Sequence, residues 1–187
     1  RSAEGCGMTC IVACVESGTV HMAADSGASA WGYTDCQVRR DPKVFKLGEA
    51  VIGFTSSWRM GQILRYDFKL PDIPEHCDLH EYMVRIFVPK LREVAKAAGG
   101  LTTKEGVEQL GRFLFGLRGR LFYVDSDFQV GEMLTDYLSV GSGAEVAHGA
   151  LFATKELPAQ QRLTTALAAA TEHCVAIRKP YIFASTT

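Results

Sequence analysis

Cysteine and histidine side chains are the first residues whose types and spacing raise the question of chemistry. Cys6, Cys10 and Cys14 recur at equal spacing. Cys10 and Cys14, however, lie inside the apolar run CIVAC, and on a strand their side chains would face the same side and pack in a core. Metal ligation favours CxxC pairs and a loop setting, which this run lacks. We therefore expect no metal and no cofactor at these cysteines.

A second group that resembles metal ligands is the run His76-Cys77-Asp78-Leu79-His80. Asp78 is followed by Glu81, and an acidic or hydroxyl residue with a glutamate three positions later is typical of the capping box that opens a helix. The pattern therefore predicts a helix start here, with the histidines on a solvated turn.

Composition limits the class of protein. A chain of 187 residues that is 47% hydrophobic forms one sizeable domain with a buried core. Lys and Arg (20) nearly balance Asp and Glu (21) without a basic block, which argues against nucleic acid or an anionic membrane as a partner. No apolar run is long enough to span a bilayer, and the first residues lack the pattern of a secretory signal. We expect a cytoplasmic protein whose six cysteines are reduced.

Period-two apolar runs predict the strands. Residues 9–15 and 19–25 form a hairpin through the turn Glu16-Ser17-Gly18, and a Gly/Ser-rich loop follows over residues 26–33. The predicted strands cover residues 9–15, 19–25, 43–47, 50–55, 112–117, 120–125, 129–134 and 181–185, with one more ending at Val140.

Helical spacing begins at Ser57, where Met60, Ile63, Leu64 and Phe68 form one apolar face. Helices are predicted from Ser57 to about Phe68, over 79–98 with an interruption or kink at Pro89, from about Gly143 to Thr154, and from Pro158 to about Cys174. Blocks of strands and helices in this order predict an α+β domain with two stacked sheets and helices on the outer faces.

Five segments resemble the bacterial HslV protease and proteasome β-subunits, which are N-terminal-nucleophile (Ntn) hydrolases. These segments are TCIVAC, AADS, KVFKL, VIGFTSS and VGSGAEVAHGAL. They keep the order and approximate spacing of that family over nearly the whole chain. The resemblance implies a single domain over residues 9–187, built as a four-layer α-β-β-α sandwich of two antiparallel sheets flanked by helices.

The resemblance maps Thr9 onto the family's N-terminal threonine, whose hydroxyl is the nucleophile and whose free α-amino group is the general base. A threonine hydroxyl is nearly inert until a base takes its proton, and an α-amine titrates near neutral pH. Asp25 and Lys43 match the aspartate and lysine that pair beside that threonine, and a nearby cation disfavours protonation of the amine. Without the resemblance, Thr9 only begins a strand, Asp25 caps a loop and Lys43 is a solvated strand residue.

Three more residues match positions of the family's site. Ser142 corresponds to a serine that hydrogen-bonds near the threonine amine, although Ser142 with Glu145 also forms a capping-box pattern. Ser56 lies where the family has a glycine-containing loop whose backbone N–H binds the oxyanion, so a donor here requires serine to adopt the necessary dihedral angles. Glu172 is the nearest candidate for a carboxylate at the end of the last helix.

Residues 1–8 (RSAEGCGM) precede Thr9 and turn its amine into an amide, which cannot act as a base. Three explanations stay open. In the first, Met8 is the native start methionine, an aminopeptidase removes it, and residues 1–7 are not part of the native protein. In the second, residues 1–8 are a pro-segment that the protein itself cleaves. In the third, the leader is permanent and the subunit is inactive. Cys6 and Cys10 are alternative nucleophiles, because other families with this fold use cysteine.

The resemblance implies a threonine-type amide hydrolase, a peptidase that acts on polypeptides as one subunit of a closed homo-oligomeric ring, with an AAA+ ATPase that unfolds substrates. The helix from Trp58 to Phe68 is a candidate for subunit contact, with a core helix as the alternative. Two other functions stay open: a catalytically inactive structural subunit, and an amidohydrolase of the same fold that acts on a small molecule.

Overall fold

The computed structural model describes residues 9–29 and 36–186, so the expected leader over residues 1–8, including Cys6, lies outside the described residues. The strands are β1 (Cys10–Glu16), β2 (Thr19–Ala24), β3 (Gly27–Ser29), β4 (Cys36–Val38), β5 (Val44–Leu47), β6 (Ala50–Thr55), β7 (Thr102–Lys104), β8 (Val107–Gln109), β9 (Arg112–Leu117), β10 (Arg120–Val124), β11 (Val130–Glu132), β12 (Tyr137–Gly141) and β13 (Ile182–Ser185). The helices are α1 (Trp58–Gln62), α2 (Leu79–Tyr82), α3 (Val88–Ala97), α4 (Ala144–Ala153) and α5 (Ala159–His173), with π-helical turns at η2 (Ile63–Asp67) and η3 (Met83–Phe87).

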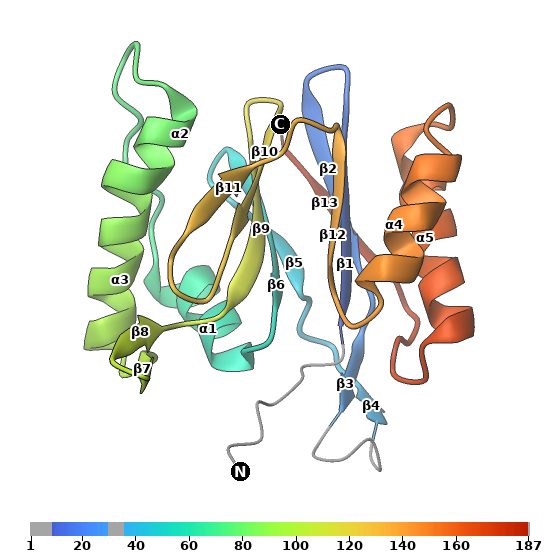
Figure 1. Ribbon diagram of the computed structural model, residues 1–187, viewed down its shortest axis with the longest axis horizontal. Coiled ribbons are helices and arrows are strands. Elements are labelled where there is room, and N and C mark those ends of the chain that lie inside the picture. Colours follow the sequence, from blue (N-terminus) through green and yellow to red (C-terminus); the bar gives the residue numbers. More distant parts are fainter. Residues whose placement is uncertain (1–8, 30–35, 187) are drawn as a thin grey trace.

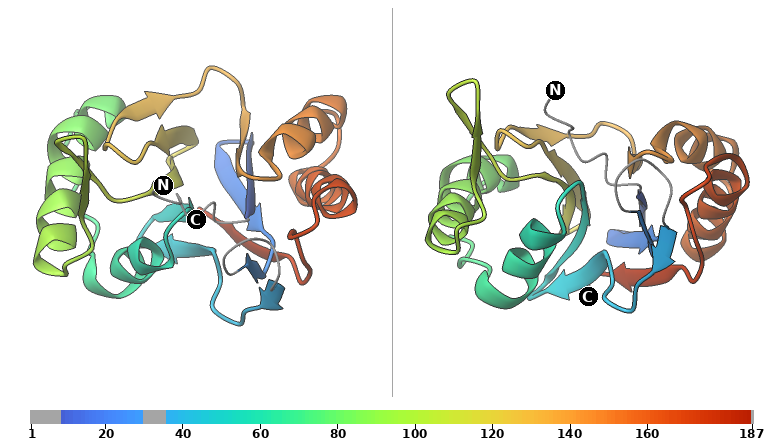
Figure 2. Two further views of the ribbon diagram at one scale, coloured as in Figure 1. Left: turned by 60° about the horizontal axis from the view of Figure 1, so that its bottom comes forward. Right: turned by 90° about the horizontal axis from the view of Figure 1, so that it is seen from below.

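Two antiparallel sheets lie face to face at the centre of the molecule. One has the strand order β12-β1-β2-β13 and the other β11-β10-β9-β6-β5. Helices α4 and α5 cover the outer face of the first sheet, and α1, α2 and α3 cover the outer face of the second (Figures 1 and 2). The result is a four-layer α-β-β-α sandwich, which confirms the predicted fold class.

Strand β1 shows why its sequence is apolar at consecutive positions. Cys10, Val12 and Cys14 pack against α4 and α5, whereas Ile11 and Ala13 pack between the two sheets. A strand covered on both faces needs apolar side chains on both. The prediction that Cys10 and Cys14 face the same side and pack in a core is confirmed.

The two helical segments on the other side also follow from local rules. Met60, Ile63, Leu64 and Phe68 are buried against the five-stranded sheet, which supports the core interpretation of that helical face. Asp78 caps α2 by accepting hydrogen bonds from the backbone N–H groups of His80 (2.8 Å) and Glu81 (3.1 Å). The predicted helix start is therefore confirmed.

The predicted interruption at Pro89 takes the form of the π-helical turn η3, which lies just before that proline. Val88 donates its backbone N–H to the Met83 carbonyl, a spacing of five residues. Proline has no N–H to donate to the carbonyl four residues earlier, so a regular α-helical ladder is broken at this point. The helix continues as α3 with Pro89 in its first turn.

Two short hairpins were not predicted. The expected loop over residues 26–33 contains β3, which pairs with β4, and β7 pairs with β8 just after α3. Strands of three residues are too short for a period-two pattern to stand out, so the local sequence resembled loops.

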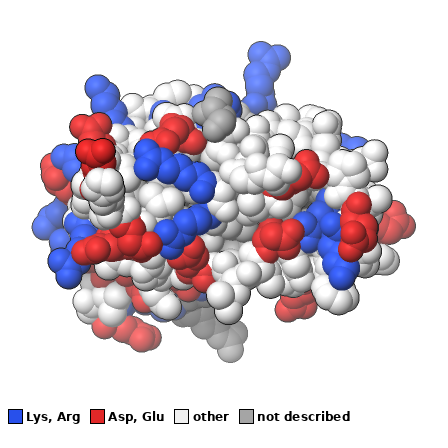
Figure 3. All heavy atoms as spheres, turned by 90° about the horizontal axis from the view of Figure 1, so that it is seen from above, with Lys and Arg blue, Asp and Glu red and all other residues white. Residues whose placement is uncertain are grey.

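Charges of both signs are interspersed on the end of the molecule opposite Thr9 (Figure 3). Surface ion pairs include Arg118 with Glu49 at 3.0 Å and Arg120 with Asp78 at 2.8 Å. None of the described helices combines the length and the apolar composition that a membrane-spanning helix requires.

Candidate active site

The start of β1 and the ends of β2 and β12 lie at the lower end of the molecule in Figure 1, as does the segment that leads into β5. In the sheet register, Cys10 of β1 lies opposite Gly141 of β12, and Ile11 lies opposite Ala24 of β2. Thr9, Asp25 and Ser142 each lie one residue beyond these pairs, so they come to neighbouring positions. Lys43 immediately precedes β5 in the facing sheet, where its carbonyl accepts a hydrogen bond from Phe54. Antiparallel pairing thus gathers residues that are far apart in the chain.

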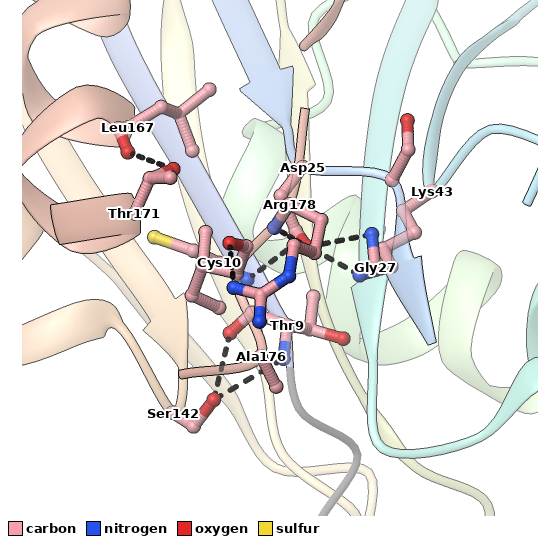
Figure 4. A network of polar contacts seen from close by, with 12 residues as sticks. Thr9, Cys10, Asp25, Gly27, Lys43, Ser142, Leu167, Thr171, Ala176 and Arg178 are labelled. Carbon is pink, nitrogen blue, oxygen red and sulfur yellow. Dashed lines mark hydrogen bonds and ion pairs between the residues drawn. The ribbon is translucent and has the colours of Figure 1, made fainter. Parts of the chain in front are cut away.

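Asp25 and Lys43 form a fully buried ion pair (Figure 4). Lys43 Nζ lies 2.7 Å from Asp25 Oδ1, and the two side chains are 1% and 0% exposed. Burial lowers the pKa of Lys43 below its usual value, and the charge of Asp25 opposes that effect. Lys43 Nζ also lies 5.9 Å from the centre of the Trp58 ring. The structure therefore holds a lysine ammonium away from water in a defined position.

The Asp25 carboxylate is held by three backbone N–H groups as well as by Lys43. Oδ1 accepts from Cys10 (3.0 Å), and Oδ2 accepts from Gly27 (2.8 Å) and Arg178 (3.3 Å). A Cβ on Gly27 would lie 2.3 Å from the Ala176 carbonyl oxygen, so only glycine fits at this close approach. Four donors fix both carboxylate oxygens, which leaves Asp25 suited to orient Lys43.

Thr9 is buried and contacts Ser142. The backbone N–H of Thr9 donates to Ser142 Oγ at 3.3 Å, and Ser142 Oγ lies 3.5 Å from the Thr9 carbonyl oxygen. Gly141 makes this approach feasible because its φ is +102° and because a Cβ there would lie 2.0 Å from the Thr9 carbonyl oxygen. The Gly141-Ser142-Gly143 turn therefore places a hydroxyl beside the nitrogen of Thr9.

The capping box of Ser142 with Glu145 was wrong. Helix α4 has Gly143 as its N-cap and no side-chain cap hydrogen bond. Ser142 is turned toward Thr9 because β12 is paired with β1 up to Gly141, which starts the helix one residue later than the local pattern suggested.

Solved structures with similar folds include Thiobacillus denitrificans BPH alone and BPH in complex with epoxomicin. They are 20% and 19% identical to this chain, with TM-scores of 0.77 and 0.76, and each match covers 95% of this chain and 97% of that chain. Eukaryotic HslV from Trypanosoma brucei is 17% identical over 94% of this chain and 98% of its own, with a TM-score of 0.65. Anbu (ancestral beta-subunit) from Yersinia bercovieri is 16% identical over 95% of this chain and 81% of its own, with a TM-score of 0.61.

The chain has the proteasome-type Ntn-hydrolase fold. No protein-family model and no curated protein matches the sequence. The resemblance seen in the five sequence segments is confirmed at the level of this fold.

Within the proteasome-type fold, Ser56 adopts a backbone conformation that glycine usually supplies. Its φ is +71°, in the left-handed region that costs an ordinary residue about 1–2 kcal/mol. The hydroxyl of Ser56 accepts a hydrogen bond from the backbone N–H of Arg112 at 3.1 Å, and Thr55 just before it is buried. Serine therefore adopts a glycine-like conformation here, and its role as an oxyanion donor stays a prediction.

Glu172 is not brought to the other candidate residues. It is exposed on α5, and in the described chain it forms no hydrogen bond or ion pair with Thr9 or Ser142. Its neighbour Thr171 instead points inward, where its hydroxyl lies 2.7 Å from the Tyr181 hydroxyl.

Cys10 is poorly suited to be a nucleophile. Its side chain is fully buried under α5, and burial, with the nearby charge of Asp25 as a second cause, raises the pKa of its thiol well above the usual value. A thiol must ionise to attack. Over residues 9–29 and 36–186, no group of three or more His, Cys, Asp or Glu side chains is arranged to hold a metal ion.

Sequence reasoning missed Gly27 and Arg178, whose backbone N–H groups bind Asp25. Gly27 follows Asp25 by two residues and was read as part of a loop. Arg178 lies 153 positions after Asp25, and no local pattern connects the two.

Proposed function

We propose that the chain is a threonine-type amide hydrolase, the peptidase subunit of a self-compartmentalising assembly, and that Thr9 is its nucleophile once residues 1–8 are removed. The observation that carries this proposal is the buried Lys43–Asp25 pair placed against the Thr9–Cys10 peptide, since Asp25 Oδ1 accepts from both Lys43 and Cys10.

A buried ion pair is poorly explained by stability alone. Removing two charges from water costs several kcal/mol per ion, and apolar replacements of such pairs are often neutral or stabilising. Buried charged groups with shifted pKa values gather at catalytic sites, where they tune a nearby acid or base. In the proposed role, the charge of Lys43 keeps a free Thr9 amine neutral at physiological pH, because a cation disfavours a second cation nearby.

The proposed reaction uses one residue as nucleophile and base. The α-amine of Thr9 takes the proton from Oγ1, and Oγ1 attacks the carbonyl carbon of the scissile amide. Backbone N–H groups near Ser56 stabilise the oxyanion, and the amine passes its proton to the leaving nitrogen as the C–N bond breaks. Water then hydrolyses the resulting ester, with the same amine as base. Ser142 holds the amine in position.

The names of the neighbouring structures support the proposal. BPH binds epoxomicin, Anbu is called an ancestral beta-subunit, and HslV matches this chain over nearly all of both lengths. We propose a homo-oligomeric ring that takes polypeptide substrates, located in the cytoplasm, with residues 9–187 as one domain and an AAA+ ATPase as partner.

Intact mass and N-terminal sequencing of the full chain, and of a chain whose translation starts at Met8, show whether Thr9 becomes the first residue. The protein is then treated with epoxomicin. We expect wild type to gain the mass of one inhibitor molecule and to lose its peptide hydrolysis. Thr9→Ala should neither form the adduct nor hydrolyse peptides. Thr186→Ala is the matched control, because Thr186 is similarly buried (6% against 5%) but binds Val20 at the other end of β2. A chain that never exposes Thr9, or an exposed Thr9 that neither hydrolyses peptides nor forms the adduct, contradicts the proposal.

A second candidate function is a catalytically inactive structural subunit. The observation that favours it is the exposed position of Glu172, which leaves Ser142 without that carboxylate as a partner. Ring assembly without adduct formation by an exposed Thr9 would support this second function.

A further inference from the structure

Arg178 is fixed beside the candidate nucleophile by its backbone. Its N–H donates to Asp25 Oδ2 at 3.3 Å, and its carbonyl accepts from the N–H of Ser26 at 2.8 Å. The other oxygen of the same carboxylate binds the N–H of Cys10, the residue next to Thr9. One carboxylate group therefore separates the Arg178 backbone from the Thr9–Cys10 peptide bond.

The Arg178 side chain is half-buried and extends toward Thr9 and Ser142 (Figure 4). Its guanidinium donates one hydrogen bond, from Nη1 to the carbonyl of Ile177 at 3.2 Å. Among the described residues, no carboxylate lies within ion-pair distance of this guanidinium, whereas Asp25 is already neutralised by Lys43. A guanidinium has five N–H donors in a planar fork that matches a carboxylate.

The proposed mechanism decides on which side of the scissile bond this charge lies. The Thr9 amine must return its proton to the leaving nitrogen, so the leaving part of the substrate lies on the amine side of Thr9. Ser142 marks that side, because its hydroxyl contacts the Thr9 nitrogen at 3.3 Å. Figure 4 shows the guanidinium on the same side.

We propose that Arg178 is a specificity-determining residue that binds a carboxylate on the leaving part of the substrate. This inference rests on the proposed function of Thr9. The carboxylate is either an acidic side chain at the first residue after the scissile bond or the free C-terminal carboxylate of a very short leaving group. Both present the same planar, singly charged oxygen pair.

Cleavage of unfolded casein, with the cut sites mapped by mass spectrometry, supplies a peptide that the enzyme cuts. Three versions of that peptide carry Asp, Asn or Lys as the first residue after the cut. We expect kcat/KM to be about tenfold higher for the Asp than for the Asn version, from one charge-assisted and partly exposed contact. Arg178→Gln should lower kcat/KM for the Asp peptide more than for the Asn peptide, so that the ratio falls to within about twofold, and Arg178→Lys should keep part of the ratio.

Arg118→Gln is the matched control, because Arg118 is paired with Glu49 at the β9–β10 turn, far from Thr9. It should leave the ratio unchanged. A ratio of one in wild type, or an equal loss for all three peptides in Arg178→Gln, overturns the inference while leaving the hydrolase proposal intact.

A binding assay tests this inference without requiring that the protein hydrolyses a substrate. Binding of fluorescently labelled leaving-group peptides to Thr9→Ala is measured by anisotropy. One comparison uses peptides that begin with Asp or with Asn. The other uses leaving groups of one or two residues, each as the free acid and as the amide. Tighter binding of Asp peptides or free acids that disappears with Arg178→Gln supports the inference, even if wild type hydrolyses nothing. Equal binding of charged and neutral versions overturns it. The two comparisons also show whether the side chain or the C-terminus supplies the carboxylate.

Discussion

Replacing Asp25 by Asn tests whether the Lys43–Asp25 pair is as buried and as coupled as the structure indicates. The change is nearly isosteric, but it leaves the Lys43 ammonium, only 1% exposed, without the carboxylate 2.7 Å away. Removing one partner of a buried pair costs about 3–5 kcal/mol. We therefore expect Asp25→Asn to lower the free energy of unfolding by that amount at neutral pH.

The partner variant should cost less. Lys43→Met leaves the Asp25 carboxylate with its three backbone N–H donors, so we expect a loss of about 1–3 kcal/mol. The double variant removes both charges and should be more stable than the sum of the single losses predicts, by at least about 2 kcal/mol. Asp41→Asn is the control, because Asp41 pairs with Arg39 at the surface, and its loss should stay below about 1 kcal/mol.

Urea unfolding followed by tryptophan fluorescence measures these differences, at one protein concentration and with the slopes compared between variants. The pH dependence gives a second check. Burial is the largest cause of the lowered pKa of Lys43, and Asn removes the opposing charge, so the folded-state pKa falls further below 10.5. Between the folded and unfolded values the unfolded chain binds more protons, so the stability of Asp25→Asn rises with pH. Its deficit relative to wild type should shrink as the pH rises above neutrality. A loss below about 1 kcal/mol, or strictly additive variants, would refute the buried-pair argument.

Three further variants test the fold around and away from the site. Gly141→Ala should lower the free energy of unfolding by about 2–4 kcal/mol and abolish epoxomicin labelling, because its Cβ would overlap the Thr9 carbonyl at a φ of +102°. Gly149→Ala in α4, with open space around its Cβ, should instead raise the free energy of unfolding in urea by about 0.5–1 kcal/mol. Equal effects of the two variants would contradict the reasoning. Burial raises the pKa of Tyr82 from 10.0 to about 12, so the folded chain holds this proton more tightly and stability falls as pH rises through that window. Tyr82→Phe should weaken that fall, and at neutral pH it should lower the free energy of unfolding by about 0.5–1.5 kcal/mol through the lost hydrogen bond to the Pro71 carbonyl. An unchanged dependence of stability on pH in urea titrations would count against this prediction.

Several elements were predictable because their signals are local. Strands β6 and β9 lie at the predicted residues, 50–55 and 112–117, since each is a long apolar run bounded by a turn or a glycine. The π-helical interruption before Pro89 follows from a missing N–H, a covalent property of proline. Strands β3, β4, β7 and β8 were missed because three residues carry too little periodicity, and their pairing rather than their composition makes them strands.

The Ser142 region shows how tertiary structure overrides a local pattern. Ser142 and Glu145 have the spacing of a capping box, yet Gly143 caps α4 and Ser142 contacts Thr9. The pairing of Cys10 with Gly141 sets where β12 ends, and that pairing joins segments more than a hundred residues apart. A local pattern carries no information about such a register.

The sequence by itself determined the order of the longer strands and the helices, the core packing of Cys10 and Cys14 on one face of β1, and the positions of Thr9, Asp25, Lys43 and Ser142 near strand ends. Only the tertiary structure decided that Lys43 Nζ lies 2.7 Å from Asp25 Oδ1 with both side chains buried, and that the Arg178 backbone binds the same carboxylate. The physical reason is that propensity and periodicity act over a few residues. Burial of charge and hydrogen bonding between distant segments exist only after the two sheets have packed.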